Sequence, residues 1–170
     1  RGGDASDKAK PDRSTNIANE ILQGSDTPTG SLIEGQEKPQ TQREQEWITR
    51  LLASESNLTL EQATDIAPLK TPLKIEKDFK GWPGAQFFTV EVTGSTAVLV
   101  INQYHPFYSE VYERLLESED PNAVDALDLL LYGYARMQDE RYSQAELLDG
   151  MNEDWGRHVK SFLVELRNRD

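Results

Sequence analysis

The pattern of hydrophobic and polar residues predicts a β-hairpin in the middle of the chain. Residues 85–92 alternate, with Phe88, Val90 and Val92 on one face, as in a half-buried strand. Residues 93–95 (Thr-Gly-Ser) favour a turn, and residues 96–102 are apolar on both faces. We therefore expect two antiparallel strands, the second of them in the interior and covered on both sides.

Helical spacing of apolar residues is found on the N-terminal side of this hairpin. Residues 42–56 repeat apolar side chains at intervals of three and four, which predicts an amphipathic helix. Thr59 followed by Gln62 forms a capping box, so a second short helix should begin at residue 60. We expect this helix to stop before Pro68 and the extended stretch 69–80 to lead into the hairpin.

Three more helices are predicted on the C-terminal side, over residues 106–116, 121–139 and 143–168. Asp120 before Pro121 marks the start of the second, and Ser143 with Glu146 forms a capping box for the third. The third carries a continuous apolar stripe, in which we expect the tryptophan to be buried: Leu147, Leu148, Met151, Trp155, Val159, Phe162, Leu163 and Leu166.

Residues 1–41 are too polar to form a core, apart from a possible short helix over residues 14–23. We expect them to be a leader and linker that is flexible or held by a partner. Residues 42–170 then form a single α+β domain, with a small antiparallel sheet, about five helices and a helical C-terminal half.

Composition narrows the possible functions. The chain has 30 Asp and Glu against 18 Lys and Arg, and this acidity disfavours direct binding to nucleic acid. Cysteine is absent, and no apolar run approaches the roughly 18 residues of a membrane-spanning helix, so we expect a cytoplasmic protein without a membrane partner. Because residue 1 is Arg, we expect a fragment or processed piece of a longer chain.

The candidate chemistry lies where the second strand meets the next helix. Asn102 and His105 end the strand and could line a ligand pocket, with His105 as an acid or base oriented by Glu110. A structural role is favoured for both: His105 would bond a carbonyl and Asn102 would fix the corner. No metal site is predicted, because the acidic residues 117–128 lack the spacing of a calcium loop. No catalytic motif is complete, so an enzyme sufficient in itself is not expected.

Aromatic residues surround the same corner. Tyr104, Phe107, Tyr108 and Tyr112 have no interleaved Lys or Arg, which favours the core or a protein interface over a surface for stacking bases. Together with Trp155 of the last helix they are the candidate interaction residues.

A resemblance to a known family is carried by residues 100–108 (Val-Ile-Asn-Gln-Tyr-His-Pro-Phe-Tyr), with the helices at 127–134 and 155–163. The last ninety residues resemble the C-terminal portion of bacterial and phage GHKL-type ATP-binding proteins, relatives of the gyrase, MutL and heat-shock-chaperone ATPases. The chain lacks that family's magnesium-holding Glu and Asn helix, its Asp-x-Gly-x-Gly loop and its glycine-rich lid. The resemblance therefore implies no cofactor in this chain, and ATP with magnesium only in an upstream domain.

Three functions remain open. The first is a non-catalytic interaction, signal-transmitting or assembly module that pairs with itself or another subunit downstream of a GHKL-type ATPase domain. The second is a ligand-binding or catalytic domain with a pocket at the corner of Asn102 and His105. The third is an acidic mimic of nucleic acid, which net charge favours but the interspersed Lys and Arg residues oppose.

Overall fold

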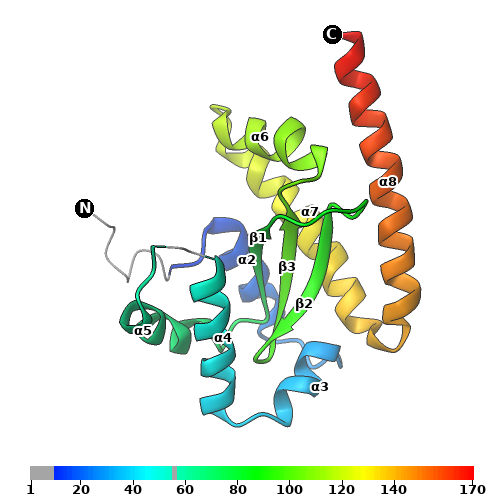
Figure 1. Ribbon diagram of the computed structural model, residues 1–170. Coiled ribbons are helices and arrows are strands. Elements are labelled where there is room, and N and C mark those ends of the chain that lie inside the picture. The colour runs from blue at the N-terminus through cyan, green and yellow to red at the C-terminus, as the bar shows by residue number, and fades with distance from the viewer. Residues whose placement is uncertain (1–9, 55–56) are drawn as a thin grey trace.

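The computed structural model describes residues 10–54 and 57–170, and within them the sheet has three strands. The strands β1 (Ile75–Lys80), β2 (Phe88–Thr93) and β3 (Thr96–Asn102) are arranged in the order β1-β3-β2, as Figure 1 shows. Strand β3 pairs antiparallel with β2, which confirms the hairpin, but parallel with β1. The sheet is therefore mixed, and the expectation of a purely antiparallel sheet was wrong.

Strand β1 lies in the stretch that the sequence indicated only as extended, because four of its six residues are charged. Three of these charges, those of Glu76, Lys77 and Asp78, are paired with residues of neighbouring helices. Glu76 is buried and accepts a hydrogen bond from Lys70 Nζ at 2.8 Å, and Asp78 pairs with Arg50 at 2.8 Å. Charged residues are common on edge strands, where they discourage pairing with another chain.

Helices cover both faces of the sheet (Figure 1). One face packs on α4 (Gln40–Ser54) and α5 (Leu60–Lys70). The opposite face packs on α7 (Pro121–Glu140), with α8 (Ala145–Arg169) and α2 (Arg13–Leu22) beside it. The protein thus has three layers, and β3 is buried on both sides as predicted.

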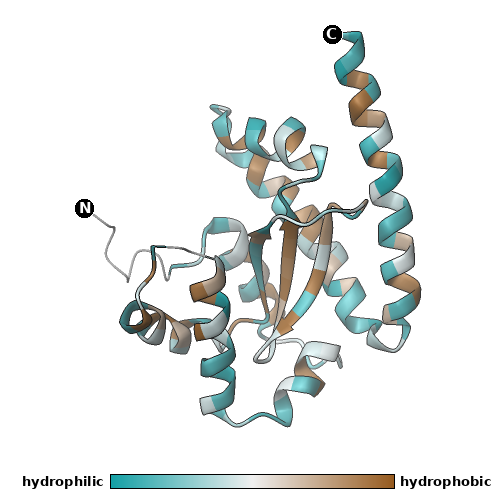
Figure 2. Ribbon diagram, viewed as in Figure 1, coloured by the Kyte–Doolittle hydropathy of each residue, from teal (hydrophilic) through white to brown (hydrophobic). Residues whose placement is uncertain are grey.

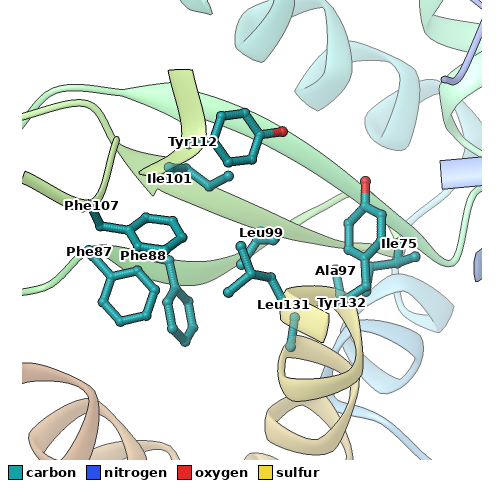
Figure 3. Close-up of a cluster of buried hydrophobic side chains, with 11 residues drawn as sticks. Ile75, Phe87, Phe88, Ala97, Leu99, Ile101, Phe107, Tyr112, Leu131 and Tyr132 are labelled. Atoms are coloured by element: carbon teal, nitrogen blue, oxygen red, sulfur yellow. The ribbon is translucent and has the colours of Figure 1, made fainter. Parts of the chain in front are cut away.

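The larger core cluster lies between the sheet and α7 (Figure 3). Aromatic rings fill one end of it, and Leu99 meets Leu131 of α7 near its middle. A smaller cluster on the opposite face joins Trp47 to Val98 and Val100 of β3. Both clusters depend on the alternation of β3, whose successive side chains point to opposite faces.

The N-terminal stretch is helical over much of its described length. Helix α2 docks on the edge of β1 through Asn19, whose Oδ1 accepts from Lys74 N and Ile75 N while its Nδ2 donates to Ile75 O at 2.8 Å. Helix α3 (Gly30–Gln36) is held by Asp139, which accepts from Ser31 N at 2.9 Å. The expectation of a linker was wrong for residues 30–36, because this polar stretch is anchored by hydrogen bonds to the body of the protein. Residues 1–9 lie outside the described part.

A buried polar network joins α2, β1, the short π-helix η1 (Tyr108–Tyr112) and α7 around Asp128. Its carboxylate accepts hydrogen bonds from Ser14 Oγ and Tyr112 OH, both at 2.7 Å, and pairs with the ammonium group of Lys77. Lys77 also pairs with Asp12. Burial alone would raise the pKa of the Asp12 carboxyl, but the hydrogen bond and charge of Lys77 lower it to about 2. This network anchors α2 to the core.

The predicted helix boundaries hold in part. The capping box of Thr59 and Gln62 is present, but α5 continues through Pro68 to Lys70. Asp120 caps α7, and Pro121 is its first residue, as predicted. The capping box of Ser143 and Glu146 was wrong, because residues 142–144 form a 3-10 turn and α8 begins after them without a side-chain cap.

The segment after the corner begins as a π-helix, η1 (Tyr108–Tyr112), and continues as α6 (Glu113–Glu117). The predicted helix over residues 106–116 is therefore confirmed in position but not in regularity. Within the described ranges, no helix combines the length and the apolar character needed to cross a membrane.

Candidate functional site

Asn102 ends β3 and fixes the turn that follows it. Its side chain is 1% exposed, and its Oδ1 accepts hydrogen bonds from Trp82 N at 3.1 Å and Tyr104 N at 3.0 Å. Its Nδ2 donates to Gln86 O at 2.8 Å. The side chain therefore joins three backbone segments, and its polar groups are engaged within the protein.

His105 connects the same turn to α8. The ring is 2% exposed; its Nδ1 accepts from Phe107 N at 3.0 Å, and its Nε2 lies 2.8 Å from Gly156 O. This arrangement requires the neutral tautomer with the proton on Nε2. Burial lowers the pKa of the imidazole, the hydrogen bond to Gly156 O opposes that shift, and the charge of Lys160 adds to it.

The corner does not bring an acid and base together. Glu110, the expected orienter of His105, pairs instead with Arg114 at 3.0 Å and Arg167 at 3.8 Å. Because Asn102 and His105 are buried and hydrogen-bonded to backbone, the geometry supports their structural interpretation. The corner joins the end of β3 to α8.

The candidate aromatic residues are divided between core and surface. Phe107 and Tyr112 belong to the core, as Figure 3 shows, and Tyr108 stacks on Tyr112 with ring centroids 6.0 Å apart. Tyr104 is exposed. Trp155 was predicted to be buried but is 41% exposed. Helix α8 therefore presents apolar side chains to solvent.

The apolar residues of α8 cover two sides of the helix. Leu148, Val159 and Leu163 face the core, where they contact the body of the protein. The other apolar residues are spaced by four, four, seven and four residues, which places them along an adjacent side of the helix. All of these are exposed: Leu147, Met151, Trp155, Phe162 and Leu166. The predicted stripe is therefore wider than core packing requires.

Helix α7 adds two apolar residues beside this exposed row. Leu130 is 71% exposed, and Met137 lies two turns further along the same helix. Both line an open groove of about 630 Å³ between α7 and α8, which Trp155 and Val159 line from the other side. We define the α7–α8 surface by seven apolar residues of the two helices, all exposed except the half-buried Met137: Leu130, Met137, Leu147, Met151, Trp155, Phe162 and Leu166.

Trp155 and Gly156 set the position of α8 beside the groove. The Trp155 ring packs against Phe87 and Tyr134, with centroids 5.0 and 5.3 Å apart. At Gly156 the helix backbone lies so close to the loop before β2 that a Cβ atom would overlap the carbonyl oxygen of Ala85. Close approach at Gly156 lets His105 reach the helix backbone.

The groove is apolar in its chemistry. Its lining consists of aliphatic and aromatic side chains with one glycine, and no residue that lines it is ionised at neutral pH. Such a surface offers no acid, base or nucleophile, but it can bury apolar side chains of another molecule. Among the described residues, no group of three or more His, Asp or Glu side chains is placed to hold a metal ion.

A signal for part of this surface was present in the sequence. Residues 127 and 129–131 are all leucine, and four leucines within five positions cannot all face one side of a helix. At least one had to be exposed, and it is Leu130.

Comparisons of the chain with protein-family models, curated proteins and solved structures find no match.

Proposed function

We propose that this chain is a non-catalytic interaction and assembly module, and that the α7–α8 surface is where it contacts another protein. The observation that carries the proposal is that only part of the apolar stripe of α8 is buried against the core. One side of the helix packs on the core, and the other presents five apolar side chains to solvent. Figure 2 shows hydrophobic segments recurring along the whole of α8.

Exposed apolar surface of this extent is uncommon on a protein that works alone. Single exposed apolar residues are ordinary, but a row of five along one helix, with Trp155 of that row lining an apolar groove, is typical of interaction surfaces. An amphipathic helix laid into an apolar groove is a recurrent mode of protein recognition. The groove between α7 and α8 has the lining that this mode needs.

The engaged polar groups of Asn102 and His105 give less support to the alternative of a pocket at the corner. The polar atoms of both side chains are hydrogen-bonded to the backbone of the protein itself. In the proposed module they have a different role. They hold β3 to α8 and so fix the position of the contact surface relative to the core.

The proposed place of the module is downstream of a GHKL-type ATPase domain, an assignment that rests on the resemblance of residues 100–108 and the two helices after them. ATP and magnesium would then be bound by that domain and not by this chain. The reading frame upstream of Arg1 tests this part: it should encode the magnesium-holding Glu and Asn helix and the Asp-x-Gly-x-Gly loop. An upstream sequence without them would contradict the placement.

Leu130→Glu should disrupt assembly, because it places a charge at the apolar groove without disturbing the core. Sedimentation velocity of the purified chain, alone and with any co-purifying partner, should show a dimer or complex that this variant disperses. Leu69→Glu on α5 is the matched control, since Leu69 is 58% exposed and lies outside the surface. A chain that is monomeric and partnerless, or equal loss of assembly in both variants, would contradict the proposal.

A further inference from the structure

The exposed row on α8 is long enough to pair with another helix along most of its length. It extends from Leu147 to Leu166, and at about 1.5 Å per residue this is roughly 28 Å. The last turns of α8 extend beyond the sheet, as Figure 1 shows, and they carry Phe162, which is 70% exposed. A second helix could therefore lie along this row.

The charges of α8 are divided between its two halves. Residues 145–156 contain four carboxylates and no basic residue: Glu146, Asp149, Glu153 and Asp154. Residues 157–169 contain four basic residues and one carboxylate: Arg157, Lys160, Arg167 and Arg169, with Glu165. The change of sign falls at residues 156–157, in the middle of the helix.

Four of the five residues of the apolar row are symmetric about the same point, whereas the mirror position of Trp155 is His158. Leu147 and Leu166 are equally far from the midpoint between residues 156 and 157, and so are Met151 and Phe162. When a second copy of the helix is laid antiparallel about that midpoint, Leu147 meets Leu166 of the second copy and Met151 meets its Phe162. The pairing is self-complementary, as a two-fold interface requires.

Charge and dipole favour the antiparallel direction. In a parallel pair, the acidic half of each α8 would lie beside the acidic half of the other, and the basic halves would also meet. In an antiparallel pair, each acidic half lies beside a basic half, and the helix macrodipoles are opposed. The whole chain has a net charge of −12, so the basic half of α8 differs in sign from the chain as a whole. The acidic half of a second α8 would complement it.

We propose that the α7–α8 surface is covered by a second copy of this chain, with the two α8 helices antiparallel about a two-fold axis near residues 156–157. This inference rests on the proposed function and names its partner. Each α8 would lay its exposed row along the exposed row of the other copy, and Trp155, which also lines the groove, would lie close to the two-fold axis. The interface would be isologous, because the same residues contribute from both sides.

Single cysteines test the direction of pairing, because the natural chain has none. Leu147→Cys and Leu166→Cys chains are prepared separately, one with a tag that changes its mass, and are treated with a short thiol-specific cross-linker. Both positions are exposed, at 62% and 59%, so neither substitution should prevent folding. We expect cross-linked dimers from the mixture and few from either chain alone. Leu69→Cys on α5 is the control and should remain uncross-linked.

Other results would overturn the inference. Efficient cross-linking within each single variant, with no cross-linked heterodimer in the mixture, would indicate parallel helices. No cross-linking of any kind, while Leu130→Glu still disperses an assembly, would refute the antiparallel pairing and leave the proposed function intact. If Leu130→Glu also changed nothing, the proposed function would fail with it.

Discussion

Replacing Asp128 with alanine should lower the free energy of unfolding by about 3–5 kcal/mol, the usual cost of removing one partner from a buried ion pair. The Asp128 side chain is 2% exposed and accepts from Ser14 and Tyr112 while pairing with Lys77. Without it, the charge of Lys77 is balanced by the half-exposed carboxylate of Asp12 alone, and the buried hydroxyl of Tyr112 loses its acceptor, whereas Ser14 can still donate to Asp12. Urea denaturation followed by circular dichroism measures the change.

Asp125→Ala is the matched control on the same helix. Asp125 pairs with Arg13, whose guanidinium is largely exposed, at 2.9 Å. Exposed pairs contribute about 1 kcal/mol or less, so this variant should remain close to the natural chain. Equal losses for Asp125→Ala and Asp128→Ala would show that the buried network does not anchor α2 and β1 to α7 as described.

Gly156→Ala should destabilise the protein by about 1–3 kcal/mol, whereas Gly150→Ala on the same helix should stabilise it by about 0.5–1 kcal/mol. The added Cβ at position 156 would overlap the carbonyl oxygen of Ala85, a backbone atom that cannot move without shifting the loop. The shift would also strain the contact of His105 with Gly156 O. At position 150 nothing lies within 4 Å, so only the helix propensity changes. Thermal unfolding of both variants measures the difference, and a stabilising Gly156→Ala would contradict the close packing of α8.

The parts of the fold that local sequence determines were predictable. Strand β3 was predicted at its observed bounds, because a run of apolar residues on both faces indicates an interior strand. The start of α7 was predicted from Asp120 and Pro121, since the cap and the proline act within one turn. Such signals depend only on neighbouring residues.

The parts that depend on distant partners were not predictable. Strand β1 contains carboxylates that are stabilised in the folded protein by ion pairs with Lys70 of α5 and Arg50 of α4. The short helix expected over residues 14–23 is present as α2 (Arg13–Leu22), but its anchoring by Asn19 on the edge of β1 and by the network around Asp128 was not predictable. These partners are separated by tens of residues, and periodicity within one segment does not reveal them.

The candidate site shows the same division. His105 and Asn102 were identified from their place at a strand end, and a structural role was preferred for both. Their partners Gly156 and Gln86 could not be named from sequence. The apolar stripe of α8 was visible, but its division into a core side and a solvent side depends on how α8 rests on the loop before β2. Because one side of α8 is exposed, a helix that was predicted to be buried is a candidate contact surface.

The central claim, that the α7–α8 surface is covered when the protein assembles, is tested most directly by methionine oxidation. The chain has two methionines, Met137 and Met151, and both lie on this surface. Dilute peroxide converts an accessible methionine to its sulfoxide, which mass spectrometry counts directly. In dilute protein we expect the exposed Met151 to oxidise readily and the half-buried Met137 to oxidise more slowly. Both should oxidise much more slowly at concentrations where the chain is assembled, while Leu130→Glu at the same high concentration keeps the dilute rates. Equal oxidation of the natural chain at both concentrations would contradict the account.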